Sequence, residues 1–289
     1  METIMPTRLV AKTSFTVGRK SAALSAGCEL GCFVAGTLVH TKEGLRPIEQ
    51  IKVGDYVLSK PESGEGEPSY QRVTQTYEYE DKAVYFAAWT VEDLGVPRMH
   101  PVDRSQWERG YVVVTGAHPF RVKHVTALDE ESLLNIVHEV NAWLSIDEMI
   151  KMDQDRRSAH GGIGFNFYVE LADGRVASLV YFEAILQHRQ PDLGIGFKRD
   201  PRSWDLRGTS IRFTKDGPVA TLDCNGWSYI ENALYEDDAV DYDYDNKDSL
   251  VTQSMGFLPM RRKVFNIEVE NTHTYYVGEP GVWVHNING

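Results

Sequence analysis

Val282-Trp283-Val284-His285-Asn286 is an apolar stretch that ends in a His-Asn pair, and it decides how the rest of the chain is interpreted. Asn is one of the few residues whose side chain can attack its own backbone carbonyl, which forms a succinimide and breaks the chain. Far upstream, Gly31-Cys32-Phe33-Val34 places a cysteine at the start of an alternating strand. A cysteine thiol can take over the preceding acyl group as a thioester. The chain therefore carries, at the two edges of a β-rich body, the residue types needed to cut itself.

The composition is that of a folded globular protein. The chain has 289 residues, of which 42% are hydrophobic and 11% aromatic, so it can bury a large core in one domain or two. Its formal net charge of −12 argues against nucleic acid or an anionic membrane surface as a partner. We expect no membrane insertion, because no apolar run approaches the roughly 20 residues that a membrane helix needs. Residues 1–20 also lack the charged-then-apolar order of a secretory signal.

The cysteines do not predict a metal site. They are Cys28, Cys32 and Cys224, an odd and sparse set that makes a poor disulfide framework. No cluster of Cys and His supplies four zinc ligands. A Cys28–Cys32 disulfide and two unpaired thiols are the alternatives for the first pair. We expect no metal and no other cofactor, because an acyl shift and an Asn cyclisation use only side chains.

Alternating apolar and small residues predict strands along most of the chain. The expected strands are 32–41, 56–59, 71–79, 83–90, 111–115, 165–171, 176–182, 209–213, 263–270, 273–277 and 282–285. Residues 130–150 have instead the spacing of an amphipathic helix, carried by Leu133, Leu134, Val137, Val140, Leu144 and Ile146.

This pattern predicts an insertion within a β domain. Residues 127–259 contain the helical pattern, further strands and an acidic run at 236–248. The expected division is an N-terminal flank at 1–31, the first part of the β domain at 32–126, an α+β insertion at 127–259, the closing strands at 260–286 and a C-terminal flank at 287–289.

Four blocks of the sequence, in order, resemble those of the Hint (hedgehog/intein) superfamily. They are Cys32-Phe33-Val34-Ala35-Gly36-Thr37-Leu38-Val39 with Val53-Gly54-Asp55, then Thr115-Gly116-Ala117-His118, then Val264-Phe265-Asn266-Ile267-Glu268-Val269 with His273-Thr274-Tyr275-Tyr276-Val277, and finally Val282-Trp283-Val284-His285-Asn286. The residues of the last two blocks are most similar to those of the intein-like Hint domains that precede toxin modules in bacterial polymorphic toxins. The resemblance covers residues 32–123 and 260–286. It implies a mostly β, horseshoe-shaped Hint fold that brings Cys32 and Asn286 together, with an α+β insertion.

The N-terminal block has the residues for an N-to-S acyl shift at Gly31–Cys32. The Cys32 thiol attacks the Gly31 carbonyl, and Gly31 suits this because it has no Cβ in the way. The departing amide nitrogen must be protonated, which a His does well near neutral pH, and His118 is the candidate. Thr115 is expected to hydrogen-bond and strain the same peptide. The alternative is that His118-Pro119 is only a turn that ends a strand.

The C-terminal block has the residues for Asn cyclisation. The Asn286 side-chain nitrogen attacks the Asn286 carbonyl and releases Ile287. His285 is adjacent and His273 is expected on the preceding hairpin strand, so either can assist proton transfer. Strand neighbours point to opposite faces, so His285 and Asn286 are expected to project oppositely unless the chain twists. The alternative for His273 is stacking on Tyr275 or Tyr276.

Two positions depart from the pattern of splicing family members. Ile287 has no nucleophile, where those members carry Cys, Ser or Thr. Ligation of the flanks is therefore not expected, and cleavage is. Asn266 stands where many inteins have Asp, and because Asn cannot act as a base, the sequence leaves that proton-transfer role without a residue.

We therefore predict single-turnover autoproteolysis after Asn286, with a second cut before Cys32 left open. The substrate is the chain's own flanks, and the resemblance implies a downstream toxin-like module in a larger exported bacterial protein. The alternative function is a catalytically silent Hint scaffold that presents the insertion as a binding module. The sequence leaves the oligomeric state and the localisation open.

Overall fold

The computed structural model describes residues 31–91, 108–128, 135–161, 164–188, 190–199, 206–225 and 258–286. The flank before residue 31, Cys28, the acidic run at 236–248 and Ile287 lie outside these residues. Among the described residues, no helix is long and apolar enough to cross a membrane.

The described chain is mostly β, as predicted, with a single α-helix. Its strands are β1 (Phe33–Val34), β2 (Leu38–Thr41), β3 (Gly44–Pro47), β4 (Tyr56–Ser59), β5 (Ser69–Ala83), β6 (Tyr85–Val91), β7 (Arg109–Val114), β8 (Pro119–Leu128), β9 (Asn135–Ser145), β10 (Phe165–Glu170), β11 (Val176–Gln187), β12 (Leu193–Arg199), β13 (Leu206–Thr214), β14 (Gly217–Asn225), β15 (Arg261–Val269), β16 (Thr274–Val277) and β17 (Val282–His285). The 3-10 helix η1 spans Ile48–Gln50, and the α-helix α1 spans Ile146–Ala159.

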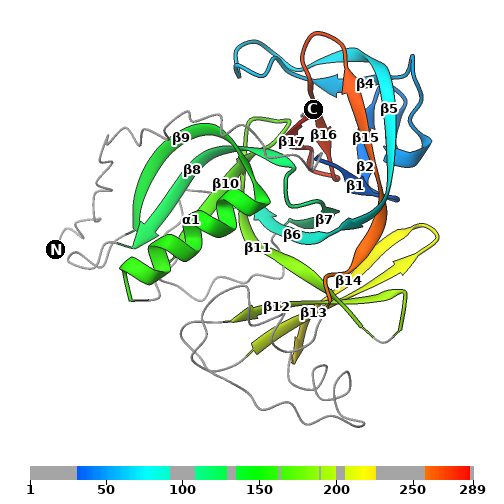
Figure 1. Cartoon of the computed structure of the whole chain (residues 1–289). Helices are drawn as coiled ribbons and strands as arrows, with labels where there is room; N and C mark the ends of the chain where they lie inside the picture. Colours follow the sequence, from blue (N-terminus) through cyan, green and yellow to red (C-terminus); the bar gives the residue numbers. More distant parts are fainter. Residues whose placement is uncertain are drawn as a thin grey trace, which may run out of the picture.

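Strand pairing brings the first and last blocks of the chain together. Strand β1 pairs antiparallel with both β15 and β7, with Phe33 opposite Phe265 and Val114. Strand β17 pairs with β16 and meets β8 at Val284 opposite Phe120. Figure 1 shows β1, β15, β16 and β17 next to one another in the upper part of the molecule. The residues just before β1 and just after β17 therefore lie in the same region.

The long strand β15 forms one wall of that region. It pairs along β5, with Asn266 opposite Tyr77 and Glu268 opposite Gln75. Alternate residues of a strand face the same side. Asn266 and Glu268 consequently point the same way, and both are buried although they are polar.

Two hydrophobic clusters fill the fold. The larger includes Phe33, Trp89, Phe120, Phe167 and Tyr275, and the second includes Cys32 and its neighbours Val34 and Phe86. A fully buried side chain of this size contributes roughly 1.5–3 kcal/mol to folding. Because Cys32 and Phe33 belong to different clusters, packing on both faces of β1 fixes the position of the cysteine.

The predicted helix over residues 130–150 is wrong in its placement. Residues 135–145 form strand β9 along β8, and the helix α1 begins only at Ile146. Asn141 has a left-handed φ of +47° next to a register shift against β8, so the alternation of apolar residues slips by one and resembles a helical spacing. Ser145 caps α1 by accepting from the Glu148 amide, while the Glu148 side chain accepts from the Ser145 amide.

Part of the predicted insertion is paired with the main sheet. Strand β8 runs across the expected boundary between residues 126 and 127. Strand β10 pairs with β8, and β11 pairs with β6, whereas β12, β13 and β14 form a second sheet. Figure 1 shows α1 on the side of β8 to β11 and the second sheet at the bottom. The division at residues 127 and 259 stays a prediction.

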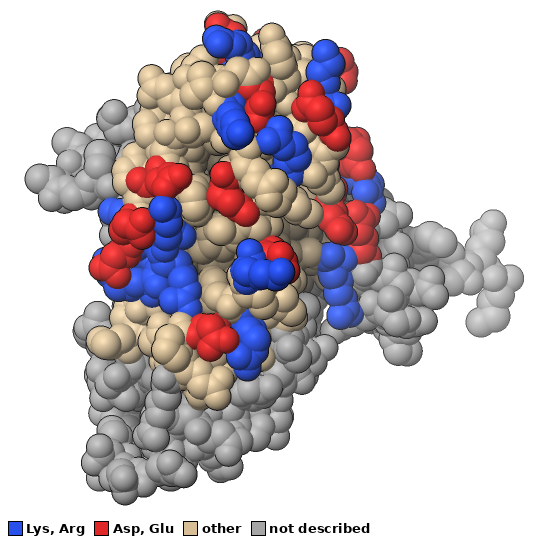
Figure 2. Space-filling view, turned by 90° about the vertical axis from the view of Figure 1, so that its right-hand side faces the viewer, with Lys and Arg blue, Asp and Glu red and all other residues tan. Residues whose placement is uncertain are grey.

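Charges are mixed on the face that carries the β5–β15 edge. In Figure 2, Lys and Arg alternate with Asp and Glu on this face. For example, Lys263 lies 2.6 Å from a Glu78 carboxylate oxygen and 3.1 Å from one of Glu80. The described residues of this face do not form a broad field of one sign.

Candidate active site

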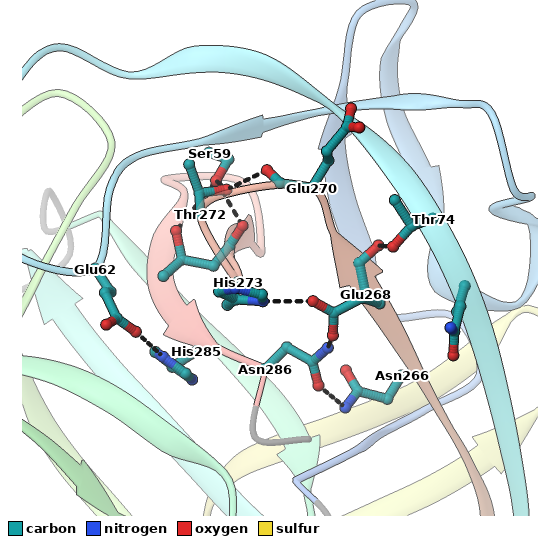
Figure 3. Close-up of polar contacts among 12 residues, drawn as sticks. Ser59, Glu62, Thr74, Asn266, Glu268, Glu270, Thr272, His273, His285 and Asn286 are labelled. Atoms are coloured by element: carbon teal, nitrogen blue, oxygen red, sulfur yellow. Dashed lines mark hydrogen bonds and ion pairs between the residues drawn. The ribbon is translucent and has the colours of Figure 1, made fainter. Parts of the chain in front are cut away.

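The Asn286 side chain is held at both ends by residues of β15. Its Nδ2 donates to Oε2 of Glu268, and its Oδ1 accepts from Asn266 Nδ2 at 2.6 Å (Figure 3). Its backbone N–H donates to the His273 carbonyl at 2.7 Å. Only 1% of Asn286 is exposed, so water does not compete for these contacts. The side chain and backbone of Asn286 are therefore held by these three hydrogen bonds.

Glu268 joins Asn286 to His273. Its second carboxylate oxygen, Oε1, lies 2.5 Å from Nδ1 of His273 (Figure 3). Glu268 is 8% exposed, whereas about half of the His273 side chain is exposed. The row Asn286–Glu268–His273 thus runs from the buried amide to solvent, an arrangement that can carry a proton out.

His273 is not on a strand, contrary to the prediction. It lies in the turn before β16 with a left-handed φ of +54°, which is uncommon outside Gly, Asn and Asp. Ser59 of β4 anchors this turn, because its Oγ lies 2.6 Å from Thr272 Oγ1 and donates to the Thr274 carbonyl at 2.7 Å (Figure 3). The imidazole contacts Glu268, and no stacking on Tyr275 or Tyr276 is found among the described residues.

His285 contacts other groups than Asn286 does. Its Nε2 lies 2.7 Å from Oε2 of Glu62, and its ring lies 5.0 Å from the Trp143 ring. The hydrogen bond to His285 lowers the pKa of the Glu62 carboxyl. His285 and Asn286 therefore project to opposite sides of β17, whereas His273 is joined to Asn286 through the side chain of Glu268.

The Gly31–Cys32 peptide is held by Thr115. The Cys32 N–H donates to Thr115 Oγ1 at 2.9 Å, and the Thr115 N–H donates to the Cys32 carbonyl at 2.9 Å. Cys32 is free and fully buried, and this burial raises the pKa of its thiol to about 12, while the charge of Lys82 opposes the shift. The thiol is thus protonated at rest, although the predicted contact of Thr115 with the scissile amide exists.

His118 is packed directly against Gly31. A β-carbon placed on Gly31 would lie 2.7 Å from Nδ1 of His118, and the His118 ring lies 4.2 Å from that of Phe33. Burial lowers the pKa of His118 to about 3, the Gly31 backbone opposes the shift, and the charge of His285 adds to it. His118 is therefore neutral at physiological pH. It can protonate the Cys32 nitrogen only after it has itself accepted a proton.

Tyr275 lies between His118 and Asn266. Its hydroxyl donates to Oδ1 of Asn266 at 2.9 Å, and its ring lies 6.4 Å from that of His118. Burial raises the pKa of Tyr275 well above its usual value, and the charges of Cys32 and Glu268 raise it further. The N-terminal and C-terminal residues thus form one continuous site.

Sequence reasoning missed Glu268 and Tyr275. The signal for Glu268 was present, because it stands two residues from Asn266 on the same face of a strand that was predicted correctly. A buried carboxylate next to a candidate nucleophile is a typical mark of a functional site. No group of three or more Cys, His, Asp or Glu among the described residues is arranged to hold a metal ion.

No family model and no curated protein matches the sequence. Solved structures that are similar to the chain include a bacterial intein-like domain from Clostridium thermocellum (17% identity, TM-score 0.40, 88% of this chain and 98% of that one). The gp41-1 intein (13%, 0.39, 89% and 98%) and a DnaB intein from Synechocystis sp. PCC 6803 (9%, 0.40, 89% and 99%) are also similar. Structural similarity at these TM-scores does not indicate which reaction the chain performs. The contacts of Asn286 and Cys32 are the basis for inferring its chemistry.

Proposed function

We propose that the chain is a self-cleaving, intein-like domain that cuts the bond between Asn286 and Ile287. The observation that carries this proposal is the buried Asn286 amide, held between an acceptor, Glu268, and a donor, Asn266. A structural Asn at a strand end needs neither a buried carboxylate nor a path from that carboxylate to solvent. The predicted resemblance to Hint domains is independent support, because it points to the same residue.

The chemistry needs only groups of the chain. Glu268 accepts one proton from Asn286 Nδ2 and shares it with His273. The nitrogen attacks the Asn286 backbone carbonyl carbon, a C–N bond forms in a five-membered ring, and the C–N bond to Ile287 breaks. The Ile287 nitrogen takes up a proton and leaves as an amine. General acid–base assistance of this type contributes about 10²–10⁴-fold.

His285 is the proposed proton donor to the leaving amine, because it precedes the scissile residue directly. In the resting geometry it is held by Glu62. Release of this contact would free the ring to turn toward the departing nitrogen. The contact with Glu62 therefore competes with proton donation by His285 and is expected to slow the cut.

A second cut before Cys32 is proposed to be slower. The Cys32 thiol passes its proton to His118, sulfur attacks the Gly31 carbonyl carbon, and the bond from that carbon to the Cys32 nitrogen breaks as His118 returns the proton to the nitrogen. A thiol pKa of about 12 and an imidazole pKa of about 3 make the first transfer strongly unfavourable at rest. Water or an added thiol would then cleave the resulting thioester and release the flank that ends at Gly31.

The substrates are the chain's own flanks. Since Ile287 offers no hydroxyl or thiol to accept an acyl group, the two flanks separate and are not ligated. The sequence resemblance supports a toxin-like module downstream, released from an exported carrier by this cut. The alternative is a catalytically silent scaffold whose segment 127–259 binds a partner.

The test is a chain extended past Gly289 by a reporter domain, followed over time by intact mass and by gel. We expect two fragments, the first ending at Asn286 and one water lighter than the same fragment with a free carboxylate, which identifies the succinimide. Asn286→Ala serves as the uncleaved control. A reporter that stays attached in the folded parent over days, across pH 5 to 9, would reject the proposal in favour of the silent scaffold.

A further inference from the structure

We propose that Asn266 and Tyr275 are positioning residues that set the direction in which Asn286 reacts. Asn266 also stabilises the negative charge that forms on Oδ1 of Asn286 during the reaction. This inference rests on the proposed cleavage after Asn286 and deepens it. It also explains why an amide, and not a carboxylate, occupies position 266.

The backbone amide of Ile267 fixes how the side-chain amides of Asn266 and Asn286 are oriented. The Ile267 N–H is always a donor, and it lies 2.8 Å from the Asn266 side-chain atom that must therefore be Oδ1. The other atom of that amide is Nδ2, which can only donate, so the atom of Asn286 that faces it must be Oδ1. Asn286 Nδ2 is then the atom left to face the carboxylate of Glu268. One immovable donor thus aims the nucleophilic nitrogen at the base.

The same contacts also stabilise the negative charge that develops on the Asn286 side chain during the reaction. When Glu268 takes a proton from Nδ2, the negative charge of the Asn286 amide moves largely onto Oδ1. Asn266 Nδ2 already donates to this oxygen at 2.6 Å in a buried site, where a fixed donor is worth more than in water. An ionised Asp at position 266 would face Oδ1 with negative charge and oppose the step.

Tyr275 of β16 supports Asn266 through its hydroxyl. Its hydroxyl is the second donor to Asn266 Oδ1, and a carbonyl oxygen has two lone pairs to receive both donors. The Tyr275 ring is completely buried. The hydroxyl acts on Asn286 only through Asn266, so its contribution is that of one neutral hydrogen bond.

Among the residues that the structure describes, few titratable groups surround the Asn286 amide, to which Asn266 donates. Glu268 on β15 and His273 in the turn before β16 contact it directly or through one side chain, and Tyr275 lies on β16. On β5, Tyr77 is the cross-strand neighbour of Asn266, and its hydroxyl donates to Gln75. A carboxylate introduced at position 266 would therefore interact mainly with Glu268.

The first experiment compares Asn266→Asp with the parent in the reporter-extended chain from pH 5 to pH 8. The introduced carboxylate at position 266 and that of Glu268 would then lie on the two sides of the Asn286 amide, which can donate from its nitrogen only. One of the two carboxyl groups must therefore be protonated to donate to the Asn286 oxygen. At pH 8 the variant should cleave about 10²–10³-fold more slowly, the usual loss for a removed charge-stabilising donor. As the pH falls and one carboxyl takes up a proton, the ratio of variant to parent rate should rise at least tenfold.

The second experiment uses Tyr275→Phe, with Tyr276→Phe as the matched control. Tyr276 is the next residue on the same strand, and its ring stacks on Trp283 at 6.1 Å, away from Asn266. Tyr275→Phe should slow cleavage by roughly 2- to 10-fold, the effect of one neutral hydrogen bond. Tyr276→Phe should leave the rate unchanged.

The outcomes separate this inference from the proposed function. If the parent cleaves, the function stands whatever the variants do. An Asn266→Asp chain whose rate relative to the parent is constant from pH 5 to pH 8 would overturn the inference, because a merely structural role predicts no pH-dependent ratio. Equal rates for Tyr275→Phe and Tyr276→Phe would remove Tyr275 from it.

Discussion

The buried His118 should make the fold sensitive to acid by an amount that can be calculated. Its pKa is about 3 in the folded chain and close to 6.5 when the chain is unfolded. Between these values the unfolded chain binds a proton that the folded chain does not. The stability is therefore fully present above pH 6.5 and is lost as the pH falls through this window.

The expected loss is about 1.4 kcal/mol of unfolding free energy for each pH unit below 6.5. This gives roughly 2 kcal/mol at pH 5 and a limit of roughly 5 kcal/mol near pH 3. Losses of this size are a substantial part of the 5–15 kcal/mol that holds a typical domain together. His118 alone should therefore lower the stability at pH 5 by a measurable amount.

The assay is urea unfolding at pH 8 and pH 5 in an Asn286→Ala background, which keeps the chain uncut. His118→Gln is compared with the same background, because Gln does not titrate in this range. Gln also loses the ring contact with Phe33, but this loss is the same at both pH values and cancels in the difference. Acid effects of other groups, such as the lowered pKa of Glu62, cancel in the same way.

We expect the background chain to lose about 2 kcal/mol more than the His118→Gln chain between pH 8 and pH 5. An equal loss in both chains would show that the imidazole is not held neutral by burial. It would also remove one of the two reasons for the second cut to be slow and leave only the raised pKa of the Cys32 thiol.

Three further substitutions test the reacting groups. Glu268→Gln should slow the cut after Asn286 by about 10²–10⁴-fold, measured by reporter release, while Glu270→Gln, an exposed position on the same strand end, should leave the rate unchanged. His273→Asn tolerates the left-handed backbone but does not titrate, so release should slow by a similar factor with an unchanged melting temperature; a parent-like rate would show that Glu268 needs no relay. Cys32→Ala should leave reporter release intact and abolish cleavage by added thiol at the N-terminal site, and loss of release in this folded variant would contradict independent cuts.

Much of the fold was predictable because its strands alternate cleanly. The closing strands β15, β16 and β17 appear within one or two residues of their predicted positions. Strands β12 and β14 were missed, since glycines and prolines interrupt their pattern. Strand β9 was missed because a bulge gave it a helical spacing.

The candidate site was predictable as a set of residues but not as a set of contacts. Cys32, Thr115, His118, His273, His285 and Asn286 were singled out by spacing and chemistry, and their catalytic roles remain predictions. The proposed base next to Asn286 depends on how β15 packs near the end of β17, which the spacing of residues along the chain does not give. The neutrality of His118 depends on burial by Phe33 and Tyr275, which come from opposite ends of the chain.

Segment 127–259 is the clearest case where tertiary structure changes the design of an experiment. Phe167 and Val169 of β10 belong to the same core as Phe33 and Tyr275. A deletion of the whole segment would open this core. A shorter deletion limited to β12–β14, which pair among themselves and with the end of β11, spares this core but removes Ile211 from the second cluster, the one that contains Cys32.

In Asn286 the attacking nitrogen and the attacked carbon belong to one residue, and its backbone is tied to the His273 carbonyl. If the chain cleaves as proposed, the rate of release depends on no second molecule, and dilution does not change it. The delay between folding and release would then be a property of each single chain. The fraction of cargo set free at a given moment would record the age of the protein population and not its abundance, so a cell could set the delay before a module acts by a few side chains around one amide.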